Sequence, residues 1–250
     1  MWFQTKGMFL VGAMAIAGVA VAQNAPSPPA TARTVIAATK LPTVTDVPLH
    51  FSVASVELAP GLKSSVSKAN GVLYQLSGST EVSVAGETKM INPGEGLFIG
   101  AGKMAELKAG SGAPSRFLHF FLVPAADLAA TPETAPAVVN EVYRTAAPIP
   151  DLRPGGYDLN LTRVTFPAGM PSNAPHHRSG AALYYVLSGT GANTIDGKVI
   201  SRAPGSFIYE PFDLVHQWGN PGGEPLTFIT FNINPEGVAA VLPGAPAKTQ

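Results

Sequence analysis

Three histidines in the C-terminal half of the chain could meet in one site. His176 and His177 adjoin each other in the stretch from Gly169 to Gly189, and His216 lies in the stretch from Gly205 to Asn220. Imidazole is a common ligand of divalent Fe, Mn, Ni and Zn. If the two stretches form facing strands, the three histidines predict a mononuclear metal site with open coordination positions.

The adjacency of His176 and His177 leaves two alternatives open. Successive residues of a strand point to opposite faces, so both rings can enter one site only if the backbone there is irregular. Pro175 before them and Ser179-Gly180 after them permit such a backbone. In the other alternative His177 is exposed, and two imidazoles alone would hold a metal weakly.

Polar and aromatic neighbours supply further candidates for the same site. Tyr184 lies two positions after Ala182, so the two side chains point to the same face of the strand and Tyr184 should face the barrel interior. Tyr184 and Glu210 are the candidates for proton transfer. Glu210 could also be a carboxylate metal ligand, although an exposed place at the rim is the interpretation we favour from sequence. Arg178 offers a planar fork suited to a carboxylate. Trp218 and Asn220 follow His216 at even spacing and are candidates for binding a ligand.

These stretches resemble the two motifs of the cupin family. Gly205 to Asn220 reads G-x5-P-x-D-x2-H-x3-N, with Asp213 where the family usually has glycine; aspartate also tolerates a left-handed turn. Gly169 to Gly189 ends in ALYYVLSG, but it keeps only one histidine of the family's pair and has Ala182 in place of the glutamate ligand. The gentisate-type dioxygenases are similar at that alanine, but their H-R-H is His-His-Arg here.

The chain contains the same pattern twice. ALYYVLSG at 182–189 matches GVLYQLSG at 71–78, and Pro204-Gly205 matches Pro93-Gly94, with 189 minus 78 and 205 minus 94 both equal to 111. Upstream the offset falls to 108, pairing Gly169 with Gly61. Repetition at a long fixed period indicates duplicated structural units. With the resemblance, it predicts an all-β fold of two tandem cupin barrels of the jelly-roll type.

The first copy lacks the residues that could bind a metal. The offset places Ala105 opposite His216, Gly71 opposite Ala182 and Ile99 opposite Glu210. His119 lies in an aromatic strand and is expected to be a packed core histidine. We therefore expect any chemistry in the second barrel, with the first serving a structural role.

Composition and the N-terminus bound the class of protein. The formal net charge is zero and no run of Lys and Arg occurs, so nothing favours binding to nucleic acid. Lys6, the apolar run from Gly7 to Val21 and the small residues before Gln23 predict a cleaved signal peptide. We expect a periplasmic or secreted protein without a membrane anchor, and without disulfides because it has no cysteine.

The expected organisation runs from a signal peptide to a second barrel. Its parts are the signal peptide at 1–22, a flexible Ala/Pro-rich leader at 23–45 with a short strand near Thr34–Ile36, a degenerate barrel at 46–125, a linker at 126–150, the C-terminal cupin barrel at 151–243 and a tail at 244–250.

Two functions remain open at this point. One is binding of a small molecule in the C-terminal barrel, with or without a weakly held divalent metal. The other, implied by the resemblance, is a metal-dependent enzyme, either a dioxygenase or an aminohydrolase resembling those that process ureidoglycine. In that enzyme Arg178 would anchor an anionic substrate. The resemblance also implies a possible homodimer, and whether the protein is an enzyme stays undecided.

Overall fold

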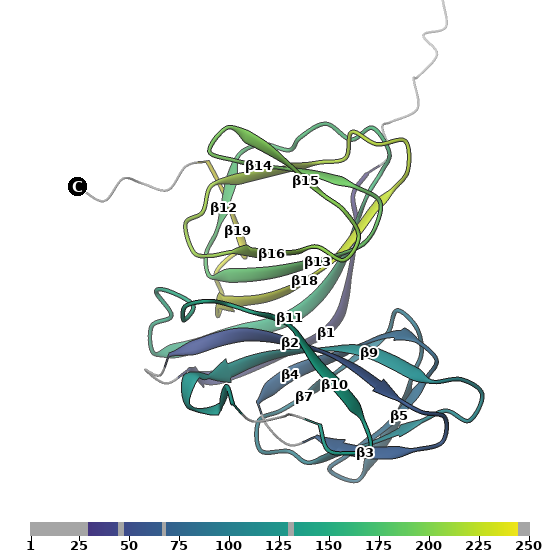
Figure 1. Ribbon diagram of the computed structural model, residues 1–250. Coiled ribbons are helices and arrows are strands. Elements are labelled where there is room, and N and C mark those ends of the chain that lie inside the picture. The colour runs from purple at the N-terminus through teal and green to yellow at the C-terminus, as the bar shows by residue number, and fades with distance from the viewer. Residues whose placement is uncertain (1–29, 45–47, 67–68, 130–132, 245–250) are drawn as a thin grey trace, which may run out of the picture.

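The protein consists of two β-barrels in tandem, seen one above the other in the computed structural model of Figure 1. The structure describes residues 30–44, 48–66, 69–129 and 133–244. The expected signal peptide and the first part of the leader lie outside these residues, as does the tail after Gly244. No helix in the described ranges is long and apolar enough to cross a membrane.

The N-terminal barrel is made of a five-stranded and a four-stranded sheet. Its strands are β2 (Leu49–Leu58), β3 (Lys63–Val66), β4 (Asn70–Ser77), β5 (Thr80–Val84), β6 (Glu87–Ile91), β7 (Gly96–Ile99), β8 (Ala105–Ala109), β9 (Ser115–Pro124) and β10 (Val138–Arg144). A single 3-10 turn, η1 (Ala125–Asp127), follows β9.

The C-terminal barrel repeats this arrangement with two five-stranded sheets. Its strands are β11 (Gly155–Phe166), β12 (His176–Arg178), β13 (Ala181–Ser188), β14 (Gly191–Ile195), β15 (Lys198–Arg202), β16 (Phe207–Glu210), β17 (His216–Gly219), β18 (Leu226–Pro235), β19 (Val241–Pro243) and, from the start of the described chain, β1 (Ala32–Val44). The prediction of an all-β fold with two cupin-like barrels is confirmed.

The strand pairing reproduces the sequence offset of 111. Gly71 pairs with Phe121 in the first barrel as Ala182 pairs with Asn232 in the second, a displacement of 111 at both positions. The hairpin predicted at Asp196-Gly197 joins β14 to β15, and both residues have positive φ, 50° and 73°. Such angles are those that a two-residue hairpin turn requires.

The edge strands are exchanged between the barrels. β1 precedes the first barrel in sequence but pairs with β11 of the second, and β10 precedes the second but pairs with β2 of the first. Two sequence expectations are therefore corrected. Residues 32–44 of the supposed flexible leader form a long strand, and the supposed linker at 126–150 contains β10. Composition could not reveal this because the paired residues are far apart in sequence, as in Val138 with Glu57 and Ala32 with Thr165.

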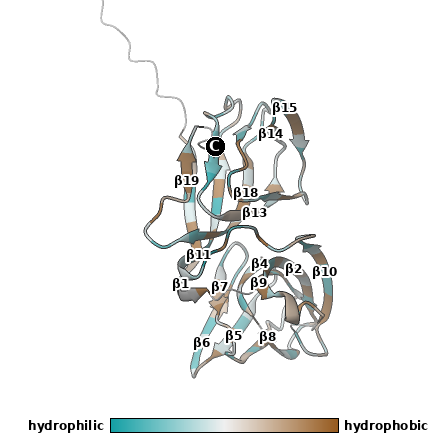
Figure 2. Ribbon diagram, turned by 90° about the vertical axis from the view of Figure 1, so that its left-hand side faces the viewer, coloured by the Kyte–Doolittle hydropathy of each residue, from teal (hydrophilic) through white to brown (hydrophobic). Residues whose placement is uncertain are grey.

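The main hydrophobic core lies between the barrels. The two sheets that face each other contribute alternate residues of their strands, so that Val53 and Phe120 from one barrel join Leu161 and Phe231 from the other. Phe120 and Phe231 pack with ring centroids 5.7 Å apart. Figure 2 shows hydrophobic segments along strands of both barrels. Because successive strand residues point to opposite faces, the neighbours of these core residues, such as Phe121 beside Phe120, face the interior of their own barrel.

Candidate functional site

A tight turn and two short strands bring the histidine stretches together. After β16 the chain turns at Asp213, whose φ of 61° confirms the left-handed geometry expected at this position. His216 then begins β17 and is paired in register with His176 of β12. The two rings lie with centroids 4.3 Å apart at an interplanar angle of 63°. The convergence of His176 and His216 thus follows from antiparallel pairing.

Glu210 is the centre of the polar cluster. It is fully buried, and its carboxylate accepts hydrogen bonds from Arg178 Nε at 3.0 Å and Trp218 Nε1 at 2.8 Å. His216 Nε2 lies 3.0 Å from Glu210 Oε2. Burial by itself would raise the pKa of Glu210, but the charge of Arg178 and the contacts with His216 and Trp218 hold this pKa below its ordinary value. Glu210 is therefore an ionised partner of Arg178, and its expected place at an exposed rim is wrong.

The two histidines are oriented by backbone carbonyls. His176 Nδ1 lies 2.9 Å from the oxygen of Ala174, and His216 Nδ1 lies 2.8 Å from the oxygen of Leu214. A carbonyl oxygen only accepts, so each Nδ1 carries the proton. Burial chiefly, with the charges of neighbouring groups, lowers the pKa of His176. His176 is thus a neutral ring whose Nε2 can accept a proton or a hydrogen bond.

Tyr184 and Arg178 join the cluster to an aromatic wall. The Tyr184 ring stacks on Trp218 with centroids 5.3 Å apart, and Phe228 packs against both rings. The guanidinium of Arg178 lies 5.3 Å from the centroid of Tyr184 and donates to its hydroxyl oxygen. Arg178 is only 6% exposed. Its fork is therefore fixed between a carboxylate, a phenol and the barrel interior.

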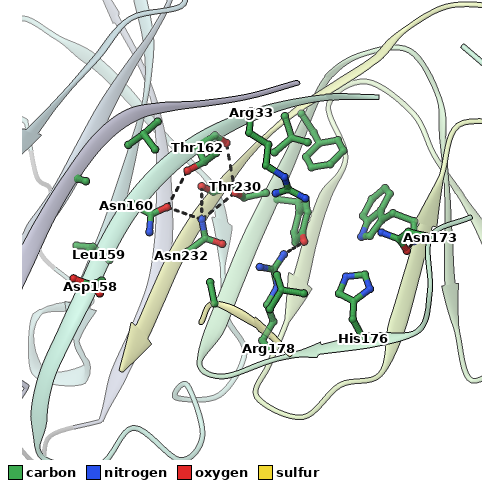
Figure 3. Close-up of a pocket in the computed structure, with 18 of the residues that line it drawn as sticks. Arg33, Asp158, Leu159, Asn160, Thr162, Asn173, His176, Arg178, Thr230 and Asn232 are labelled. Carbon is green, nitrogen blue, oxygen red and sulfur yellow. Dashed lines mark hydrogen bonds between the residues drawn. The ribbon is translucent and has the colours of Figure 1, made fainter. Parts of the chain in front are cut away.

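These side chains border a cavity of about 940 Å³ inside the C-terminal barrel. Figure 3 shows Arg33 and Arg178 directing their guanidinium groups toward each other, while His176 lies beside the cluster and a group of asparagines and threonines lies farther along the strands. Glu210 and His216 lie behind this lining. The cavity is bounded by β1, β11, β12, β13, β17, β18 and β19.

Sequence reasoning missed Arg33 and the polar side chains of β11 and β18. Arg33 lies in the segment interpreted as a flexible leader, so no local signal could have placed it in the second barrel. Asn160 and Thr162 alternate with the buried Leu159 and Leu161. That alternation, repeated in β18, is the signal that could have identified the polar lining.

Two sequence candidates do not face the cavity. His177 lies on the opposite side of β12, where its Nδ1 is 3.2 Å from Asp213 Oδ1, so it is not part of the site. Asn220 is fully buried, and its Nδ2 donates to the carbonyl oxygens of Phe166, Pro167 and Glu224. Asn220 therefore holds a loop, which corrects its assignment as a ligand-binding residue.

The donor groups do not fit the divalent metal that the sequence suggested. His177 is absent from the cluster, His216 Nε2 faces Glu210, and the carboxylate of Glu210 is occupied by Arg178 and Trp218. The described residues contain no group of three His, Cys, Asp or Glu side chains arranged around a metal ion. The guanidinium of Arg178 supplies the positive charge beside the carboxylate instead.

The equivalent interior of the first barrel is mostly apolar, with a buried polar cluster of Gln75, Thr80 and Ser115 and one buried histidine. His119 is fully buried, as expected, with its ring 3.8 Å from that of Phe121. Sequence reasoning did not identify its partner, Glu133, whose Oε1 lies 2.5 Å from His119 Nδ1. Gly71 and Ile99 occupy the places of Ala182 and Glu210. This barrel contains no equivalent of the Arg178–Glu210 pair among its described residues.

Known proteins resemble this chain in fold. A family model described as Cupin domain matches residues 162–232, which run from β11 to β18. A variant of oxalate decarboxylase from Bacillus subtilis has a TM-score of 0.56 at 16% identity, over 80% of this chain and 74% of that one. A variant of salicylate 1,2-dioxygenase from Pseudoaminobacter salicylatoxidans has a TM-score of 0.50 at 12% identity, over 75% of each chain.

No curated protein matches the chain in sequence. At such low identities the structural neighbours establish the fold alone. Residues 162–232 match the Cupin domain model, and the chain as a whole has the fold of two cupin-like barrels in tandem.

Proposed function

We propose that the C-terminal barrel binds a small organic anion in the cavity beside Glu210. The observation that carries the proposal is the pair of guanidinium groups that enter this cavity from β1 and β12. Glu210 neutralises Arg178, whereas Arg33 forms no ion pair with any residue in the described ranges. An anion bound in the cavity would therefore supply a negative partner for Arg33 and accept hydrogen bonds from guanidinium groups that already point into the cavity.

The like charge of the two arginines strengthens this argument. Arginine stays protonated in proteins, so both side chains carry a positive charge at the cavity, Arg178 buried and Arg33 partly exposed to solvent. Burial, and after it the charge of Arg178, lowers the pKa of Arg33. Both causes oppose the charged form of Arg33, and a bound carboxylate or phosphate would relieve the repulsion between the two cations.

Ligand-induced changes in melting temperature test the proposal. The mature protein is titrated with acetate, D-gluconate, benzoate, oxalate and phosphate, and at least one should raise the melting temperature with concentration. Saturation to one hundred times Kd would stabilise the fold by about 2.7 kcal/mol. Ala38→Trp, which places a large ring in the cavity, should abolish the shift. Thr34→Trp, on the same strand but outside the lining, is the matched control.

Two results would contradict anion binding here. One is that no anion in the set changes the melting temperature up to about 10 mM, which is roughly tenfold above the usual upper limit of KM values. The other is a shift that persists unchanged in Ala38→Trp, because binding would then take place elsewhere.

The second candidate is a metal-dependent enzyme, favoured by what the structural neighbours are. Oxalate and salicylate, in the names of two neighbours, are both carboxylates, and one oxalate decarboxylase from Bacillus subtilis has Mn(II) centres. The donor set of this chain favours the binder. Metal analysis of protein never exposed to chelator decides between them: about one metal per chain would support the enzyme, whereas below about a tenth of a metal would support the binder.

We also propose that the protein is exported, after cleavage of its signal peptide, to the periplasm or the medium. Support comes from the sequence of residues 1–22 alone. The test is the intact mass and N-terminal sequence of protein recovered from each cellular fraction. A mature chain beginning at Gln23 outside the cytoplasm would support export, and full-length protein confined to the cytoplasm would contradict it.

A further inference from the structure

The cavity of the C-terminal barrel has a polar group of side chains beyond its two arginines. Asn160 and Thr162 of β11 lie beside Thr230 and Asn232 of β18, and we name these four residues the amide–hydroxyl ladder. Asn232 Nδ2 donates to Asn160 Oδ1 at 2.9 Å and to Thr230 Oγ1 at 2.9 Å, and Thr162 Oγ1 donates to Asn160 Oδ1 at 3.0 Å. These contacts fix the ladder in one arrangement (Figure 3).

The ladder keeps unused hydrogen-bonding capacity toward the cavity. Asn232 is only 5% exposed, yet its Oδ1 accepts no hydrogen bond from another described residue, and neither does Asn160 Nδ2 donate one. Neither atom is among the fully buried polar atoms without a partner, so both are accessible from the cavity and a ligand can reach them. An acceptor and a donor side by side match the hydroxyl group of a ligand, which can donate and accept at once.

The ladder and the arginines are close enough for one small molecule to contact both. Tyr184, whose hydroxyl accepts from Arg178, is paired in register with Thr230. Directly opposed residues in an antiparallel sheet have Cβ atoms about 5 Å apart. Thr230 and Asn232 are two positions apart on β18, which is about 7 Å along the strand. A chain of about six carbons would extend from the guanidinium groups to the free amides.

The third wall of the cavity is aromatic. Trp218, Tyr184 and Phe228 stack on one another and contribute ring surface beside the cationic end. Carbon-bound hydrogens of a polyhydroxylated molecule can pack on such rings while its hydroxyls face polar groups. The arginines, the amides and the aromatic rings therefore match a ligand that has an anionic group, hydroxyl groups and an apolar face of carbon-bound hydrogens.

We propose that the ligand is a hydroxylated carboxylate of about sugar-acid size, held by its carboxylate at Arg33 and Arg178 and by its hydroxyls at the amide–hydroxyl ladder. This proposal rests on the proposed function and assigns the chemical class of the anion. An apolar carboxylate would leave Asn232 Oδ1 without a partner, and a neutral sugar would leave the two guanidinium groups without an anion.

Three probes separate the contributions of charge and hydroxyl groups. Isothermal titration is carried out with D-gluconate, hexanoate and D-glucose, which have respectively both groups, the carboxylate alone and the hydroxyls alone. D-gluconate should bind at least tenfold more tightly than either of the others, because hydrogen bonds to a charged group and to a fixed amide each contribute roughly a factor of ten.

Variants assign each part of the ligand to its side chains. Arg33→Met should weaken D-gluconate about tenfold and Arg116→Met, an exposed arginine of the other barrel, should leave it unchanged. Asn232→Leu should weaken D-gluconate without weakening hexanoate. If Asn232→Leu lowers the melting temperature too far for titration, Asn160→Ala, at a half-exposed position of the same ladder, replaces it.

The outcomes distinguish the hydroxylated carboxylate from the more general proposal that the C-terminal barrel binds an organic anion. Equal affinity for hexanoate and D-gluconate would overturn the hydroxylated carboxylate but would leave anion binding in the cavity supported. Stronger binding of D-glucose would overturn the hydroxylated carboxylate as well. Failure of all three probes, with another anion of the melting set bound, would overturn it as well. Failure of every anion would overturn the proposed function itself.

Discussion

The two barrels share one backbone pattern and differ in what it encloses. By the same offset, Leu73 is the counterpart of Tyr184 and Leu107 is the counterpart of Trp218. At these two positions an aliphatic side chain in one barrel corresponds to an aromatic side chain in the other. Both Leu73 and Leu107 are fully buried. The strand framework therefore does not depend on the chemistry inside the barrel, because it is stabilised by the ladders and by the core between the barrels.

The largest effect is expected on replacing Glu210 by the residue of the sister barrel. Glu210→Ile leaves the buried guanidinium of Arg178 and the indole N–H of Trp218 without their acceptor, and should lower the free energy of unfolding by about 3–5 kcal/mol. Urea unfolding followed by tryptophan fluorescence measures the change. The double variant Glu210→Ile/Arg178→Met should recover most of the loss. If the double variant is as unstable as the single one, the buried charge is not the cause.

The pH dependence of stability should report the same pair. The pKa of Glu210 is lowered in the folded state, so its contribution is fully present above its unfolded pKa of about 4.3 and is lost as pH falls through the folded pKa. Unfolding measured between pH 7 and pH 3 should show this loss in the native sequence and a smaller loss in the double variant. Identical profiles would contradict the assignment.

The next effect concerns a position where the barrels differ by a single methyl group. A Cβ on Gly71 would lie 2.7 Å from the oxygen of Phe120 and 2.8 Å from Phe121, although the equivalent residue of the second barrel is Ala182. Gly71→Ala should destabilise the protein by roughly 1–3 kcal/mol through overpacking. The matched change Ala182→Gly should cost less, about 1 kcal/mol. Equal costs in thermal unfolding would mean that the two interiors are equally packed.

A smaller effect is expected at Asn220, whose counterpart by the sequence offset is Ala109. Asn220→Ala removes donors to three loop carbonyls and should cost about 1 kcal/mol of stability. Affinity for the anion identified by titration should stay within about twofold, because Asn220 does not line the cavity. A loss of affinity without a loss of stability would restore Asn220 as a ligand-binding residue.

The smallest effect is expected at Lys40 of β1. Lys40 forms an ion pair with Glu236 at the solvent-exposed mouth of the cavity, where screening by water leaves little net attraction. Lys40→Ala should leave both the unfolding midpoint and the affinity for the anion unchanged. Arg33→Met, on the same strand, should lower that affinity. A marked weakening of anion binding in Lys40→Ala would extend the cationic end of the cavity to its mouth.

The sequence alone was sufficient for the fold and for half of the site. Period-two alternation and turn residues such as Asp196-Gly197 indicated the strands and hairpins, because these signals act over a few residues, and the repeat offset indicated two barrels. The left-handed turn at Asp213 also follows from local pattern, and the resemblance to the two motifs predicted that His176 and His216 could converge.

Only the tertiary structure decided which side chains share the cavity. Arg33 reaches it through an exchanged strand, His177 turns toward Asp213, and Glu210 is buried by Arg178, Trp218 and His216. Each of these outcomes depends on contacts between segments far apart in sequence, whose geometry no local pattern encodes. A carboxylate at a strand end has the same local sequence whether it is exposed or paired, so its role was determined by the arginine that folding placed beside it.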